Sequence, residues 1–104
     1  MARDKLKWKD KQLFIFDMYN RSIWPRDSHA KQGINVDQSF TSGCGDEEYL
    51  KKLEEGLAES FKLCSPDIVM FNAGTDVLVG DPLGGCKVPT LVLLWRISDC
   101  ETLR

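Results

Sequence analysis

Residues 67–85, with the sequence DIVMFNAGTDVLVGDPLGG, combine a short apolar run with two tight turns. The run over 67–73 is apolar on both faces, which is typical of a strand buried in a parallel sheet. Gly74 permits a sharp turn after this strand, and Asp76 follows it. Ligands of such sheets bind beyond the carboxyl ends of the strands, so Asp76 is a candidate metal ligand or catalytic group. The alternative is that Asp76 caps the turn through its own side chain.

The sequence predicts a helix upstream of this stretch. Acidic residues over 46–48 suit the positive end of a helix dipole, and Pro66 ends the helix by Cys64 or Ser65. Gly56 should weaken the middle of the helix by about 1 kcal/mol relative to alanine. One apolar stripe follows at spacings of three and four residues: Tyr49, Leu50, Leu53, Leu57 and Phe61.

Two further apolar runs, over 13–19 and 89–95, predict a first and a third strand, and residues 26–45 predict an irregular loop. The order strand, loop, helix, strand, loop, strand predicts an α/β fold, a partial parallel-sheet domain with three strands and one clear helix. The predicted domain covers 13–95, between a charged N-terminal end over 1–12 and a tail over 96–104. One helix is too few to cover both faces of a parallel sheet, so we expect marginal stability.

The chain has 104 residues, a formal net charge of −2 and 42% hydrophobic residues. This length leaves room for one modest domain, and the composition is too apolar for a disordered chain. The nearly balanced charge argues against direct nucleic-acid binding. No apolar run is long enough to span a bilayer, so no membrane partner is expected.

Four cysteines stand at 44, 64, 86 and 100, without the paired spacing of a zinc finger. The first twelve residues are charged and contain no signal peptide, which predicts a protein inside the cell, in the nucleus or the cytoplasm. Free thiols are then the favoured state, with a disulfide framework as the alternative. The charged start is expected to be a solvated end, with a nuclear-import or phosphate-binding patch as the alternative.

Several motifs in one order resemble the zinc-dependent histone deacetylases. Residues 73–84 resemble that family's Ala-Gly-x-Asp-x-Leu-x-Gly-Asp-x-Leu-Gly segment. The upstream stretches FDMYNRSIWPRD over 16–27, AKQ over 30–32 and DEEYL over 46–50 resemble the class IV branch, the histone deacetylase 11-like proteins. The likeness runs from about Gln12 to Gly85 and is weaker over 88–94. It implies an arginase/deacetylase-like sheet.

The resemblance implies roles for five residues. In that family, two aspartates and a histidine hold Zn²⁺ and leave an open position for the water that attacks an acyl-lysine amide. Asp76 matches the later zinc aspartate, and Gly74 permits the turn that aims it. Trp24 matches the wall of the acyl-lysine tunnel, with a core aromatic as the alternative, and Leu83 matches the tunnel rim. Asp17 matches a strand end that contributes to a monovalent-cation site.

The chain also departs from the family pattern. It contains no Asp-x-His-x-Gly motif, no histidine pair and no Gly-Gly-Tyr loop, so no catalytic residue is assigned. Residues 95–98, WRIS, stand where Ser-Gly-Gly-Tyr is expected. Residues 27–29 spell Asp-x-His, but they lie in a predicted loop without the following glycine. They are expected to be solvated loop residues, with a metal site as the alternative.

The expected function is that of a fragment of a zinc-dependent protein-lysine deacetylase or deacylase that is inactive alone. One carboxylate cannot hold Zn²⁺ in catalytic geometry, so stable zinc binding by this chain is not expected. The full-length family would act on acylated lysine of histones or other proteins. The alternative is a non-catalytic or dominant-negative module that associates through exposed strand edges. A third reading is a small α/β domain whose motifs coincide by chance.

Overall fold

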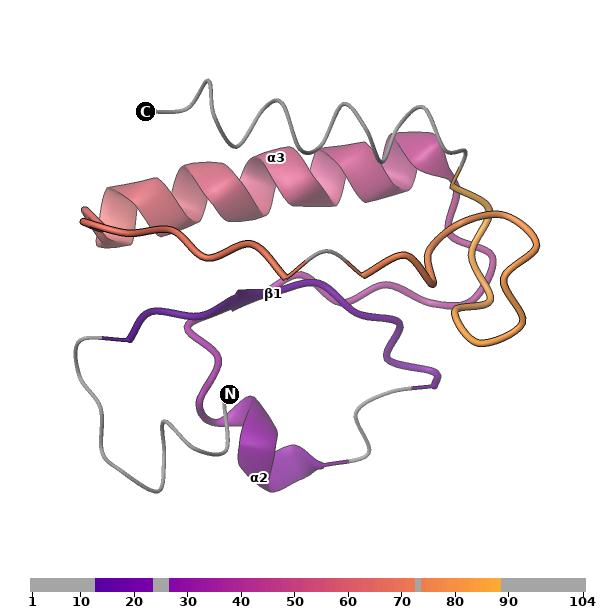
Figure 1. Ribbon diagram of the computed structural model, residues 1–104, viewed down its shortest axis with the longest axis horizontal. Coiled ribbons are helices and arrows are strands. Elements are labelled where there is room, and N and C mark those ends of the chain that lie inside the picture. Colours follow the sequence, from indigo (N-terminus) through magenta and orange to yellow (C-terminus); the bar gives the residue numbers. More distant parts are fainter. Residues whose placement is uncertain (1–12, 24–26, 73, 89–104) are drawn as a thin grey trace.

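A computed structural model describes residues 13–23, 27–72 and 74–88 (Figure 1). Their regular elements are β1 (Phe16–Asp17), α2 (Ser28–Lys31), β2 (Val36–Asp37) and α3 (Asp46–Leu63). Among these residues, no helix is both long and apolar enough to cross a membrane.

The sheet consists of two short parallel strands. Phe16 of β1 pairs with Val36 of β2, and Asp17 pairs with Asp37. Parallel pairing reappears at an isolated bridge between Asn20 and Phe40. The α/β class with parallel pairing is therefore confirmed, although the first strand is shorter than its apolar run. Its partner β2 lies inside the stretch that the sequence predicts to be a loop.

The helix α2 corrects the same loop prediction. The Asp27 side chain accepts hydrogen bonds from the backbone N–H groups of His29 and Ala30, at 3.1 and 3.0 Å. These bonds satisfy donors that the first turn of a helix otherwise leaves unpaired. Asp27 is thus the N-terminal cap of α2, and His29 is an exposed residue of this helix. The prediction missed α2 because four residues are too few to show helical periodicity.

The long helix α3 confirms the predicted element and its boundaries. It begins at Asp46, with three acidic residues in its first turn, and Cys64 follows its last residue. It lies along the sheet in Figure 1 and contacts both strands. Two residues of the predicted apolar stripe, Tyr49 and Leu53, are buried together with Gly56. The other three, Leu50, Leu57 and Phe61, are half-buried, so the stripe is confirmed in part.

The core lies where α3, the end of β2 and the later loop meet. The Tyr49 ring packs edge-on against Phe40, with 5.9 Å between ring centroids and 66° between ring planes. The buried cluster consists of Phe40, Cys44, Tyr49, Val77, Cys86 and Val88. Through this cluster, the 77–88 segment packs against α3.

The predicted second strand, over 67–73, is wrong for its described residues. Residues 68–72 belong to no helix and to no strand ladder. Ile68 and Met70 are 83% and 79% exposed, because no described segment pairs with this stretch to cover them. Further along, Leu78 and Val88 form a parallel bridge. The predicted third strand, over 89–95, lies outside the described residues.

Replacing Gly56 with alanine should destabilise the fold by about 1–2 kcal/mol, although alanine favours helices. A β-carbon at this position would overlap the Phe16 ring and lie 2.9 Å from Cγ of Gln38. The overlap outweighs the gain in helix propensity. Urea denaturation followed by circular dichroism measures the change. Glu55→Ala, at the exposed neighbouring position, is the control and should change stability by less than about 0.5 kcal/mol. Higher stability of the Gly56→Ala variant would contradict the close contact with Phe16.

Candidate functional site

The candidate zinc ligand Asp76 lies in a turn that precedes the Leu78 bridge. The backbone N–H of Leu78 donates to the carbonyl oxygen of Thr75 at 3.2 Å and closes this turn. The Asp76 residue is exposed. A β-carbon at position 74 would lie 3.2 Å from Oδ1 of Asp76, so the absence of a side chain at Gly74 leaves room for the carboxylate.

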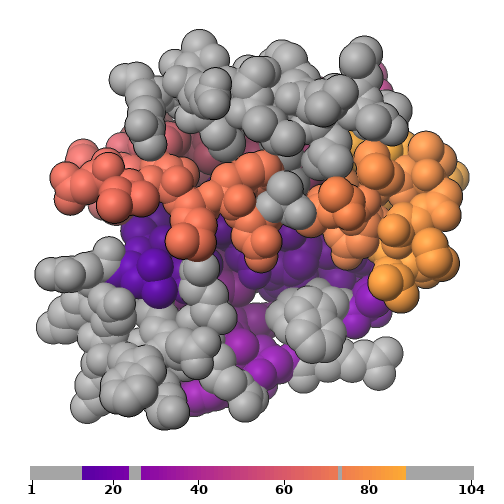
Figure 2. Space-filling view, in the orientation of Figure 1, coloured from indigo at the N-terminus to yellow at the C-terminus, as the bar shows by residue number. Residues whose placement is uncertain are grey.

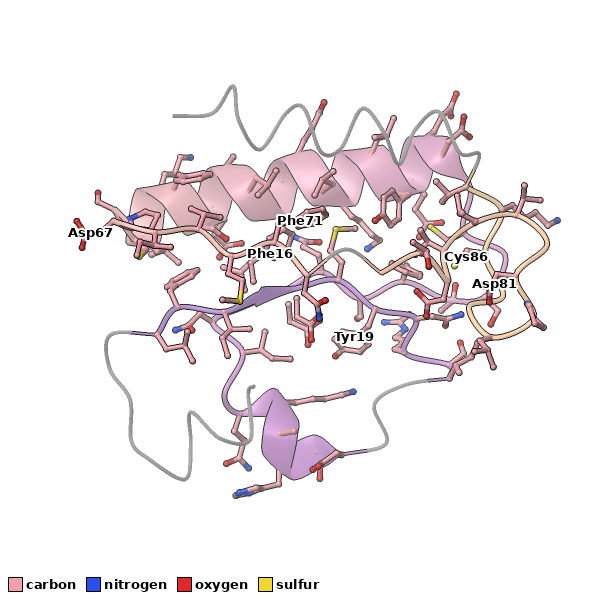
Figure 3. All side chains as sticks on the ribbon, viewed as in Figure 1. Phe16, Tyr19, Asp67, Phe71, Asp81 and Cys86 are labelled. Carbon is pink, nitrogen blue, oxygen red and sulfur yellow. The ribbon has the colours of Figure 1, made fainter. Side chains whose placement is uncertain are left out.

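A second carboxylate organises the loop that follows. Oδ1 of Asp81 accepts the backbone N–H of Leu83 at 2.8 Å and that of Gly84 at 3.2 Å (Figure 3). The sequence signal for this turn is an aspartate followed by Pro82, a common turn pattern. Turn capping is therefore shown for Asp81, whereas the role of Asp76 remains a prediction.

Gly84 lies directly behind the Asp76 turn. A β-carbon at this position would overlap the backbone carbonyl of Asp76 and lie 3.2 Å from the nitrogen of Val77. The two backbone segments thus touch at a point where only glycine fits. This contact fixes the Asp76 backbone against the 80–85 loop.

Asn20 joins this loop to the ends of both strands. Its Nδ2 donates to the carbonyl oxygen of Gly84 at 2.9 Å and to Oγ of Ser42 at 3.0 Å. Its Oδ1 accepts the backbone N–H of Ser22 at 3.0 Å. Asn20 is only 8% exposed. The sequence alone assigns Asn20 no role of its own, because side-chain bonds across 64 positions leave no local pattern.

Replacing Asn20 with alanine should lower stability by about 2–3 kcal/mol, because it leaves the buried Gly84 carbonyl without this donor. The measurement is the midpoint of urea denaturation. Ser42→Ala removes one of the same hydrogen bonds at an exposed position, and should cost less than about 1 kcal/mol. Equal losses of stability in the two variants would show that the hydrogen bond to Gly84 contributes no more than the bond to Ser42.

Asp17, the candidate cation ligand, lies in β1 opposite Asp37. Burial and the neighbouring Asp37 charge raise the pKa of Asp17 above its usual value. Asp37 also accepts the hydroxyl hydrogen of Tyr19 at 2.6 Å. Burial and this hydrogen bond raise the pKa of Tyr19. On the face of the same ring, the Lys31 ammonium lies 5.2 Å from the ring centre. The structure does not test whether Asp17 binds a cation.

Two buried thiols lie between the helix start and the Asp76 loop. Burial and the Glu48 carboxylate raise the pKa of Cys44 to about 11. Burial and the Asp76 carboxylate raise the pKa of Cys86 as well. Both thiols therefore carry their protons at neutral pH, as expected for free cysteines in a core.

The described residues do not form a complete zinc site. In 13–23, 27–72 and 74–88, no three His, Cys, Asp or Glu side chains come together in a way that could hold a metal ion. Of the residues singled out for the substrate tunnel, Leu83 is 73% exposed and Trp24 lies outside the described part. A catalytic zinc ion needs three protein ligands, so this part of the chain does not fit one.

The chain matches the histone deacetylase domain family over residues 3–103. It is 43% identical to histone deacetylase 2 of Arabidopsis thaliana over 79 residues, which are 76% of this chain and 20% of that protein. It is 33% identical to histone deacetylase 18 of the same plant over 97 aligned positions, in a match that covers 81% of this chain and 14% of that protein. The chain thus spans a fifth or less of the length of these curated relatives. No solved structure matches it.

Proposed function

Because the chain belongs to the histone deacetylase family, we propose that it is a piece of a zinc-dependent protein-lysine deacetylase or deacylase. The complete enzyme would hydrolyse the amide bond of acylated lysine on histones or other proteins, and so act in chromatin regulation. The motifs over 16–50 support the class IV branch within this family.

The observation that carries this proposal is the placement of Asp76. The residue stands in a turn, with Gly74 before it and Gly84 packed against its backbone. Asn20 connects the same loop to the strand ends, which is the edge where parallel sheets bind ligands. This chain would contribute one aspartate to a zinc site, and other parts of the enzyme would contribute the remaining ligands.

We expect the 104-residue chain to be inactive alone. One carboxylate cannot hold Zn²⁺ with an open position for water and substrate. The test is an acetyl-lysine peptide assay with added zinc, comparing the chain with an Asp76→Ala variant. Both should give the same background. Turnover clearly above that of Asp76→Ala would overturn the proposed inactivity.

A second arm tests the assignment of Asp76 itself. In a longer protein that contains this chain and deacetylates the peptide, Asp76→Ala should abolish turnover and lower the bound zinc measured by elemental analysis. Asp81→Ala, a nearby aspartate with a turn-capping role, should retain its zinc. Full activity of the Asp76→Ala enzyme would overturn the assignment of Asp76 as a ligand.

A second candidate function is a non-catalytic module that binds the full enzyme or its partners. The observation that favours it is the apolar 68–72 stretch, which lies in no helix or strand and leaves Ile68 and Met70 largely exposed. Such stretches pair readily with other strands. The chain should co-purify with a full-length deacetylase of the family, and Met70→Lys should weaken the association. Val79→Lys, at an exposed site outside the stretch, is the control. A monomer that binds neither enzyme nor partner would contradict this role.

A location inside the cell, in the nucleus or the cytoplasm, forms part of the same proposal. Its support is the proposed action on acylated lysine of histones and other proteins. Fractionation of cells that express the tagged chain tests it, and recovery from the medium would contradict it.

A further inference from the structure

Cys44 and Cys86 lie on neighbouring backbone segments. The backbone N–H of Gly43 donates to the carbonyl oxygen of Gly85 at 2.8 Å. The backbone N–H of Lys87 donates to the carbonyl oxygen of Cys44 at 2.9 Å. These two hydrogen bonds flank Cys86 on both sides. Cys44 and Cys86 therefore lie on two segments that are joined directly by backbone hydrogen bonds.

The two side chains also share one environment. Cys44 is 2% and Cys86 is 5% exposed, and both belong to the buried cluster around Tyr49. The Cys86 thiol is also one of the groups that raise the pKa of Cys44. Figure 3 places Cys86 beside the start of α3, at the end of the molecule that also holds the Asp81 loop. The two residues therefore belong to one buried cluster and lie on two hydrogen-bonded segments.

Both thiols make hydrogen bonds to carbonyl oxygens, and the Cys44 thiol also interacts with the Glu48 carboxylate. The sulfur of Cys44 lies 3.5 Å from the carbonyl oxygen of Gly45, and that of Cys86 lies 3.4 Å from that of Gly84. Thiols are weak hydrogen-bond donors, so little is lost when these contacts are exchanged for a covalent bond.

We propose that Cys44 and Cys86 are a site of oxidative modification, a thiol pair that closes to a disulfide when the protein meets hydrogen peroxide. One thiol loses its proton and attacks a peroxide oxygen, which gives a sulfenic acid and releases one water. The second thiol then attacks this sulfur, forms the S–S bond and releases a second water. The two thiols give up two electrons, and one peroxide is reduced to two waters.

Peroxide reaches the pair through local opening. Cys86 stands between Gly85 and Lys87, which are both exposed, so the segment that carries it lies at the surface. Such surface segments open more easily than the whole domain unfolds. The thiols react from this open state, in which burial no longer suppresses their reactivity.

The test treats the reduced full chain with hydrogen peroxide and then blocks the remaining thiols. Intact mass before blocking should fall by about 2 Da, the mass of two hydrogens, and dithiothreitol should restore it. Peptide mapping without reductant should find Cys44 joined to Cys86. A map that joins either residue to Cys64 or Cys100, or links two chains, would overturn the proposal, as would four free thiols after treatment.

Two controls separate the folded geometry from chance pairing. Cys64→Ala should oxidise as the parent chain does, whereas Cys86→Ala should no longer lose two hydrogens. Oxidation in denaturing urea should give several pairings in place of one. If the same single link dominates in urea, the folded contact is not its cause and the proposal fails. The mapping of the parent chain decides the question even if Cys86→Ala does not fold.

Discussion

Replacing Gly84 with alanine is expected to abolish cooperative folding of the chain, at a cost of about 3 kcal/mol or more. The new β-carbon would overlap the carbonyl oxygen and carbonyl carbon of Asp76, which are both backbone atoms. A rotamer change cannot relieve such an overlap, so one of the two segments must move. Because the expected stability of a small domain is modest, this loss removes much of it. Urea denaturation followed by circular dichroism gives the measurement.

Gly45→Ala is the matched control. Among the described residues beyond its two chain neighbours, no atom lies within 4 Å of a β-carbon at this position, where the backbone φ of −94° suits any residue. Gly45 caps α3 without a side-chain hydrogen bond, so alanine should cost less than about 1 kcal/mol. A Gly84→Ala chain with the denaturation midpoint of Gly45→Ala would show that Gly84 does not touch the Asp76 turn.

Replacing Phe40 with alanine should destabilise the chain by about 3–5 kcal/mol. Phe40 is 2% exposed and packs edge-on against Tyr49 at the centre of the buried cluster. The substitution removes apolar contacts and leaves a cavity where β2 ends and α3 begins. The denaturation midpoint in urea should fall while the slope of the transition stays constant.

The control for this substitution is Leu63→Ala at the last residue of α3. Leu63 is 63% exposed, so its loss should change stability by less than about 0.5 kcal/mol. Similar midpoints for Phe40→Ala and Leu63→Ala would contradict the placement of the core around Tyr49.

The predicted helix was recovered with its boundaries because its signals are local. Acidic residues begin α3, one apolar stripe faces the sheet, and Pro66 follows the last turn. The class of the fold was predicted for the same reason, since a short apolar run at Phe16 does form a parallel strand. The family was recognised from several motifs in one order, and the family match over 3–103 confirms it.

The errors lie where structure depends on distant partners. Residues 68–72 have the composition of a buried strand, yet a strand requires neighbours that the described residues do not supply. The strand β2 has only two residues, and its formation depends on β1, so no periodicity marks it. The bond from Asn20 to Gly84 was equally hidden, because hydrogen bonds between distant loops follow from the fold and not from spacing.

The distance along the chain between Asn20 and Gly84, 64 positions, also determines the order of events during synthesis. The bond between Ile15 and Asn35 spans only 20 positions, so it can form early in a chain that emerges N-terminus first. Closing the longer loop carries a greater entropic cost and needs residues that leave the ribosome later. The β1–α2–β2 unit should therefore assemble while the Asp76 turn is still being translated. Asp76 is then the last part of the described site to adopt its folded position. A pause in translation before Gly84 would leave the Asp76 turn without the backbone contact that fixes it.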